Sequence, residues 1–217
     1  MGAGGMRTLV IDSATEACSV ALFDDGEYLT GAFRVLGRGH AEQLVPMIAE
    51  LPDSGRASRI AVALGPGSFT GVRVGLAAAR ALAFAWDAAL VGYSSLALVA
   101  AMARAAVNAD GDGEAEGLAV AMTAGHGEWF VQCFDPGGAI SPLAALRPEA
   151  ALTEVSEQVV AGSAAEVLVA HRGWGRALPI LPDGRAFALL GAASLTADTR
   201  PLYGRAPDAR PTRVAAA

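Results

Sequence analysis

The sequence predicts an α/β fold of two lobes, in which each lobe is a mixed sheet with helices. The first observation is the order of patterns in the N-terminal half, where three strands precede alternating helices and strands. The second is the polar, glycine-rich stretch NADGDGEAEG at residues 108–117. The third is a second pair of strand patterns after it. We expect an N-terminal lobe at residues 6–107, a hinge at 108–117 and a smaller C-terminal lobe at 118–217.

The composition indicates a globular protein and excludes several catalytic and binding mechanisms. Apolar residues make up 53% of the 217 residues, which is enough for a large core. The sixteen basic residues are all arginine, so a Walker-type lysine, a Schiff base and a catalytic lysine are excluded. The net charge of −6 offers no broad electrostatic footprint for nucleic acid, so we expect any RNA contact to be local or made by a partner.

Cysteine and histidine give no indication of a metal or a disulfide. Cys18 and Cys133 lie far apart within apolar stretches, which favours two buried, reduced thiols. His40, His126 and His171 show no metal-ligand spacing. We expect no metal site.

The N-terminus predicts a cytoplasmic protein. MGAGGMRTLV has no basic segment before an apolar core and no cleavage site, and Met6 is a candidate natural start. The apolar stretch at residues 74–92 carries Arg80 and Asp87, which argues against a membrane span.

The first lobe is expected to open with a three-stranded meander. RTLVIDSA reads as a buried strand, and CSVALFDDGEYLTGAF reads as two strands around the turn Asp25-Gly26. HAEQLVPMIAEL, from His40, has helical spacing of apolar residues and carries Pro46 within the pattern.

Two further strand–helix pairs complete this lobe. RIAVALGPGS is a strand that ends in a glycine turn, and a long helix is expected from Phe69 to about Trp86. ALVGYSS is another short strand, after which Ser94 or Ser95 can cap the helix LALVAAMARAA.

The second lobe has a looser pattern that partly repeats the first. LAVAMTA and EWFVQCF read as strands, with a turn at residues 136–138. A weaker extended stretch, a short strand at Gln158–Ala161 and a helix from Ser163 follow, and a last helix is expected near residues 187–197. Two lobes that both begin with strand hairpins suggest an ancient duplication.

The stretch ALGPGSFTGVRVGLAAARAL does not match either common phosphate-binding motif. Five residues separate Gly65 from Gly71 and no lysine follows, so it is not a P-loop. GPGSFTG also has one residue too many for a dinucleotide-binding fingerprint. An anion at the helix start remains as an alternative, because free N–H groups there favour negative charge.

A structural role explains more of these residues. Gly65 and Gly67 form the turn, and Ser68 caps the helix. Gly71 and Gly75 then begin a stripe of small residues at every fourth position, which continues at residues 79 and 83. Glycine in a helix costs roughly 1 kcal/mol relative to alanine, so the stripe suggests that another backbone comes close. Spacing alone leaves open whether that neighbour belongs to the same lobe or to another chain.

Arg73 and Arg80 share a different face of the same helix, since they are seven residues apart. They are expected either to reach a partner's carboxylates or to be solvated.

Several motifs carry a resemblance to the TsaB (YeaZ) family. MRTLVIDSATEACSVALFDDG from Met6 and GPGSFTGVRVGLAAARALA from Gly65 are the long, specific ones. His40 followed by LVPMI, GEWF in the second lobe and RPLYGRAP near the C-terminus also fit its layout. The resemblance covers nearly the whole chain in order.

The resemblance implies the actin/Hsp70/sugar-kinase (ribonuclease H-like) fold and an accessory role. It implies a non-catalytic dimerisation subunit in the N6-threonylcarbamoylation of adenosine 37 in tRNAs that read ANN codons. The implied partners are TsaD, which carries the metal and transfers the group, and the ATPase TsaE. Without TsaD the family self-associates through a similar surface, and tRNA is contacted only indirectly. The chain itself is expected to have no catalytic residue, cofactor, metal or membrane contact.

Carried over to this sequence, the partner surface maps to the helices at His40–Leu51 and Phe69–Ala83 and favours another chain as the neighbour of the small-residue stripe. The expected interface residues are His40, Leu44, Met47, Phe69, Gly71, Val72, Gly75, Leu76 and Ala79.

This chain departs from related sequences at two turns. ATP-using relatives of the fold hold phosphate at a D-x-G-[ST] turn, where this chain has Asp12, Ser13, Ala14 and Thr15. Asp12 and Thr15 therefore mark a degenerate phosphate loop. The family commonly has Asp-Ala-Arg before Gly-Glu in the second lobe, where this chain has TAGH at residues 123–126.

Two alternative functions remain at this stage. One is an ATP-binding member of the same fold, which the missing lysine and the degenerate turn disfavour. The other is a hydrolase or peptidase with Ser68, His40 and Asp12 as a triad. Ser68 is better explained as a helix cap, and nothing in the sequence brings the three residues together.

Overall fold

The computed structural model describes residues 5–111 and 116–204. Expectations for residues 1–4, for part of the hinge and for the chain beyond residue 204, including the end of RPLYGRAP, lie outside the described residues.

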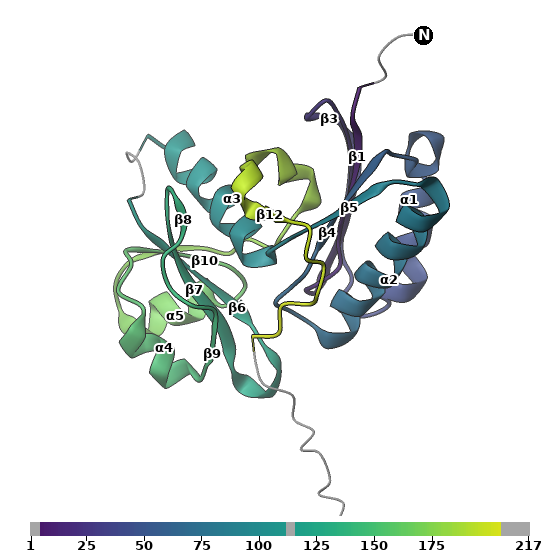
Figure 1. The fold of residues 1–217 in the computed structure, drawn as a ribbon. Helices are drawn as coiled ribbons and strands as arrows, with labels where there is room; N and C mark the ends of the chain where they lie inside the picture. The colour runs from purple at the N-terminus through teal and green to yellow at the C-terminus, as the bar shows by residue number, and fades with distance from the viewer. Residues whose placement is uncertain (1–4, 112–115, 205–217) are drawn as a thin grey trace, which may run out of the picture.

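The first lobe contains the expected meander within a six-stranded mixed sheet (Figure 1). Its strand order is β12-β5-β4-β1-β2-β3. The meander is antiparallel around Asp25-Gly26, and β4 and β5 run parallel to β1. The strands are β1 (Arg7–Asp12), β2 (Ala17–Asp24), β3 (Glu27–Val35), β4 (Arg59–Ala63), β5 (Ala89–Tyr93) and β12 (Leu195–Thr196).

Both faces of this sheet are covered, which explains why β1 and β2 are almost wholly buried. Helices α1 (His40–Ala49) and α2 (Phe69–Trp86) lie side by side on one face (Figure 1). The 3₁₀ segment η3 (Gly184–Leu189) lies on the other face. The alternation of side chains along β1 shows this directly: Ile11 faces α2 and Val10 faces η3.

The second lobe is a smaller mixed sheet between helices. Its strand order is β11-β10-β6-β7-β8, and β9 also pairs with β7. α3 (Ser95–Ala109) packs on one face, and α4 (Pro148–Glu154) and α5 (Ala165–Arg172) pack on the other. The strands are β6 (Leu118–Thr123), β7 (Trp129–Asp135), β8 (Gly138–Ala139), β9 (Ala144–Leu146), β10 (Val159–Ala161) and β11 (Arg176–Leu178). The expected fold class is confirmed; α4 and β11 were not anticipated.

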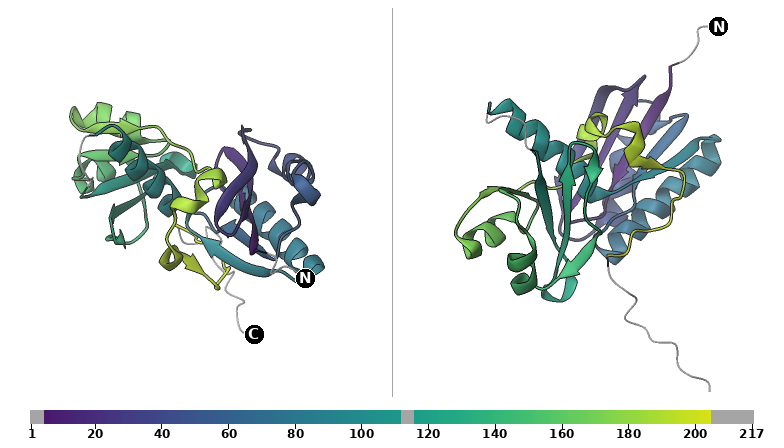
Figure 2. Two further views of the ribbon diagram at one scale, coloured as in Figure 1. Left: turned by 90° about the horizontal axis from the view of Figure 1, so that it is seen from above. Right: turned by 60° about the vertical axis from the view of Figure 1, so that its left-hand side comes forward.

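The prediction of a helix near residues 187–197 is wrong. This stretch forms η3, a second 3₁₀ turn η4 (Ala192–Ser194) and β12, which pairs antiparallel with β5. Gly184 anchors it by donating its N–H to Ser19 Oγ at 2.8 Å, and Gly191 interrupts any longer helix. The chain therefore returns to the first sheet (Figure 2), although the sequence assigned all of 118–217 to the second lobe. The division into domains stays a prediction.

Cys18 is buried, Cys133 is only half-buried, and both are free thiols. Burial raises the pKa of each thiol to about 11. Within the described ranges, no helix is long and apolar enough to cross a membrane.

Candidate functional site

Asp12 at the end of β1 connects the turn after β1, the end of β5 and the start of α3. Its carboxylate accepts hydrogen bonds from Ala14 N at 3.0 Å, from Ser95 Oγ at 3.3 Å and from Tyr93 Oη at 3.5 Å. Tyr93 ends β5 and Ser95 begins α3, so the buried carboxyl joins the turn after β1 to the start of α3, the helix that packs on the second sheet. Burial raises the pKa of Asp12 to about 7, and the hydrogen bonds offset this only in part.

The turn into α2 has the expected cap. Ser68 Oγ accepts the Gly71 N–H at 3.3 Å, which confirms the N-cap, and Gly65 has a positive φ of 90°. A Cβ at Gly67 would overlap the carbonyl oxygen of Ala14, so only glycine fits there. In the same way Ser94, rather than Ser95, caps α3.

The small-residue stripe on α2 packs against this chain's own β1–β2 turn. A Cβ at Gly71 would overlap the Ser13 carbonyl oxygen, and one at Gly75 would lie 2.5 Å from Ser13 Oγ. Ser13 Oγ donates to Gly71 O at 2.9 Å, and Ser68 N donates to Ala14 O at 2.6 Å. The backbone that approaches the stripe is therefore that of the same lobe, and the expectation of another chain at the stripe is wrong.

This packing also corrects the expected interface. Eight of its nine residues are buried within this chain, because they face the sheet or the turn rather than solvent. They are His40, Leu44, Met47, Gly71, Val72, Gly75, Leu76 and Ala79. Phe69 is the exception, with 57% of its surface exposed. The eight buried residues shape α1 and α2 from within and cannot touch a partner directly in this conformation.

The opposite sides of α1 and α2 leave apolar side chains in solvent. Val45 is 60% exposed and Phe84 is 92% exposed. The exposed residues around them are mostly alanines, and we call the whole set the outer face: Ala41, Val45, Pro46 and Ala49 of α1 with Ala77, Ala81, Phe84 and Ala85 of α2. Helical periodicity places Phe84 opposite the small-residue stripe of α2, and Val45 on the side of α1 that faces away from its buried residues. This face was not among the interface residues expected from the sequence.

A cleft with a volume of about 800 Å³ lies between the lobes. The β1–β2 turn, the start of α2, the loop after β6 and residues 202–204 line it. Within it, the Arg73 guanidinium lies 3.4 Å from the centre of the Phe69 ring, and Tyr203 packs beside that ring. Residues 123–126 face this cleft from the second lobe.

The geometry gives little support to either alternative function. The start of α2 covers the degenerate phosphate turn at Ser13 and Ala14, and Thr15 Oγ1 accepts the N–H of Ala17.

The three residues of the hypothetical Ser68–His40–Asp12 triad make separate structural contacts instead. His40 Nε2 lies 3.3 Å from Ala17 O, Ser68 is a helix cap, and Asp12 contacts Tyr93 and Ser95. Among the residues that the structure describes, no group of three or more His, Cys, Asp or Glu side chains could hold a metal ion.

Comparison with known proteins gives three kinds of similarity. A family model described as TsaD, tRNA N6-adenosine threonylcarbamoyltransferase, matches residues 34–160. The tRNA threonylcarbamoyladenosine biosynthesis protein TsaB of Escherichia coli K12 is 42% identical over 100 residues, which is 44% of this chain and 43% of that protein. TsaB of Haemophilus influenzae is 43% identical over 106 residues, or 46% of this chain and 43% of that protein. The chain thus aligns with less than half the length of these curated relatives.

Solved structures align over much more of the chain. YeaZ from Pseudomonas aeruginosa is 30% identical and has a TM-score of 0.73, and the match covers 91% of this chain and 99% of that one. The ethanolamine utilization protein EutJ from Carboxydothermus hydrogenoformans is 13% identical with a TM-score of 0.52; that match covers 85% and 90% of the two chains and supports the fold alone.

Proposed function

This chain belongs to the TsaB (YeaZ) family, within the wider family that the TsaD model describes, and from that membership we propose that it serves tRNA threonylcarbamoyladenosine biosynthesis as a non-catalytic subunit. It pairs with a TsaD-like catalytic subunit, which transfers the threonylcarbamoyl group to N6 of adenosine 37 in ANN-decoding tRNAs. The proposal places the chain in the cytoplasm.

The observation that carries the proposal is the outer face. Phe84 and Val45 are large apolar side chains in solvent on two adjacent helices, and such patches commonly mark protein–protein contacts. The alanines around them let a partner helix approach closely. Arg73, Arg80 and Glu42 are exposed on the same helices and add charged groups beside the apolar residues.

Three features support an accessory rather than a catalytic role. Asp12 is buried and bonded to groups of its own lobe, and α2 covers Ser13 and Ala14 of the degenerate phosphate turn. Ser68 serves as a helix cap. These polar groups serve to hold the first lobe in shape.

The remaining partners follow from the same proposal. A TsaE-like ATPase joins the pair, and tRNA is contacted through the complex. Without the catalytic subunit, the outer face pairs with a second copy of this chain.

Reconstitution tests the proposal. The chain is incubated with threonylcarbamoyl-adenylate and an ANN-decoding tRNA, alone, with purified TsaD, or with both TsaD and TsaE. We expect no modified adenosine from the chain alone, co-purification with TsaD, and modification only when TsaD is present. Modification by the chain alone would contradict the non-catalytic role, and failure to co-purify would contradict the pairing.

A further inference from the structure

The segment from Leu195 to Gly204, which we call the C-terminal strap, runs from the edge of the first sheet to the cleft. It begins as β12, which pairs Leu195 with Tyr93 of β5. It then passes alongside α2 and ends beside the second lobe, as the yellow trace in Figure 1 shows.

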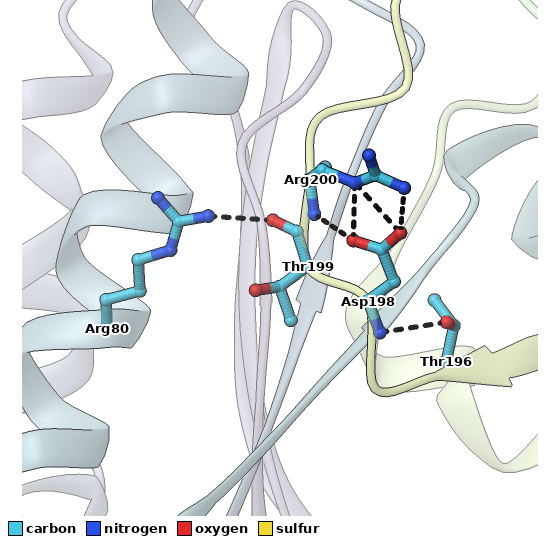
Figure 3. Close-up of polar contacts among 5 residues, drawn as sticks. All are labelled: Arg80, Thr196, Asp198, Thr199 and Arg200. Carbon is cyan, nitrogen blue, oxygen red and sulfur yellow. Dashed lines mark hydrogen bonds and ion pairs between the residues drawn. The ribbon is translucent and has the colours of Figure 1, made fainter.

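Two arginines on the exposed side of α2 hold the strap. Arg80 donates to the backbone carbonyl of Thr199 at 2.8 Å (Figure 3), and Arg73 lies 3.4 Å from Tyr203 Oη. The two arginines that share one helical face thus reach this chain's own C-terminal segment.

The strap is shaped locally before it meets α2. Asp198 accepts the Arg200 N–H at 3.1 Å and pairs with the Arg200 side chain at 2.6 Å, while its own N–H donates to Thr196 Oγ1 at 3.0 Å (Figure 3). These contacts are all within the strap. None of them attaches the strap to either lobe.

A hollow of about 610 Å³ lies beneath the strap, between it and the ends of β4 and β5. Leu202 and Tyr203 remain 40% and 49% exposed. Besides β12 and the arginines, a backbone bond from Leu202 N to Leu64 O at 2.8 Å attaches the strap to the first lobe. The strap is therefore held at separate points, to which Leu195 packing on the core and the contact between the Tyr203 and Phe69 rings also contribute.

The far end of the strap meets the second lobe. A Cβ at Gly204 would lie 2.6 Å from the Phe130 ring and 3.6 Å from Leu143. Leu202, Tyr203 and Gly204 also line the cleft. The strap thus bridges the two lobes at the mouth of the cleft.

We propose that the C-terminal strap is a latch across the interlobe cleft, held closed by Arg73 and Arg80, and that a partner docking on the outer face releases it. Both arginines stand in the same exposed row of α2 as Ala77 and Phe84, so a partner seated there meets them. A partner carboxylate can pair with arginine through two parallel hydrogen bonds between opposite charges, whereas Thr199 O and Tyr203 Oη are neutral and each accepts one. The release step rests on the proposed function; the latch itself does not.

Hydrogen exchange on the full chain tests the latch. The variant is Arg73→Ala/Arg80→Ala, and the control is Arg200→Ala, which removes an arginine that pairs only within the strap. Losing two hydrogen bonds, each worth about 1 kcal/mol, should speed exchange of strap amides, including Leu202 N–H, about 5- to 30-fold. The control should match the parent.

Spin labels at Thr70→Cys on α2 and Glu166→Cys on α5 report lobe separation, in a chain with both native cysteines replaced by alanine. The double variant should shift the distance distribution to longer values. Unchanged exchange and unchanged distances in the double variant would overturn the latch, as would an equal effect of Arg200→Ala.

A second arm adds TsaD to the labelled parent chain. If TsaD binds and the distance between the two labels increases as in the double variant, the result supports release of the strap. If TsaD binds and the distance distribution is unchanged, the release step is overturned, while the proposed pairing with TsaD stands. If TsaD does not bind, the proposed function and the release step fail together, and the variants alone decide the latch.

Discussion

The two faces of α2 carry similar small residues but serve different neighbours. On the inner face, Gly71 and Gly75 lie against Ser13, with no space for even a methyl group. On the outer face, Ala77 is exposed and Phe84 is 92% exposed. A stripe of small residues therefore marks the closest approach of backbone, and here that backbone belongs to the same lobe. The face proposed for the partner is the opposite one.

The difference between the two faces of α2 can be tested by introducing leucine on each face in turn. Gly71→Leu would drive a side chain into the Ser13 carbonyl oxygen, so we expect a loss of unfolding free energy of about 3 kcal/mol or more. Ala77→Leu on the exposed face should change it by about 0.5 kcal/mol at most. Urea denaturation measures both. Equal effects would show that Ser13 does not lie against the inner face.

The turn that packs on the inner face contains a buried carboxyl whose ionisation opposes folding. The folded pKa of Asp12 is about 7 and its unfolded value is about 4, so the folded chain retains a proton that the unfolded chain loses between these values. Ionisation of Asp12 therefore lowers the free energy of unfolding as pH rises from about 4 to 7, and the loss between pH 5 and 8 is roughly 2.5 kcal/mol.

Asp12→Asn should remove the part of the pH dependence of stability that comes from Asp12, while the part from other ionisable groups remains. Thermal unfolding of both proteins from pH 5 to 8 measures it, and parallel profiles would contradict the buried, protonated carboxyl.

The smallest expected change in stability is at Ser68, the N-cap of α2. Ser68→Ala removes the acceptor for the Gly71 N–H, and loss of an N-cap costs about 1 kcal/mol. Ser68→Asn, which can still cap, should recover most of the loss in chemical denaturation. No difference between alanine and asparagine would indicate that the cap contributes nothing to stability.

Local patterns predicted much of the first lobe. The meander around Asp25-Gly26, the helix from Phe69 and the cap at Ser68 all depend on neighbouring residues, and each is confirmed. The stretch near 187–197 was misread as a helix because its structure depends on distant partners, namely Ser19 and Tyr93.

The candidate site was harder to predict, since burial is a tertiary property. Periodicity placed Gly71 and Gly75 on one face but could not say which backbone would cover it. Spacing also paired Arg73 with Arg80, yet the strap they hold lies more than a hundred residues along the chain. Tyr93 and Ser95 lay in an expected strand end and helix start, but no local pattern indicated that they would bond to Asp12, about eighty residues earlier in the chain.

The measurement that tests the central claim most directly is the affinity for TsaD of three single variants. Phe84→Glu and Val45→Glu place a charge on the outer face, and Val167→Glu does so at a 47% exposed valine on α5 of the second lobe. We predict that the first two weaken binding at least about tenfold in calorimetry, a loss of about 1.4 kcal/mol, with unfolding free energies near the parent value. Val167→Glu should bind like the parent. Parent-like binding by both outer-face variants would contradict the assignment of the outer face to the partner.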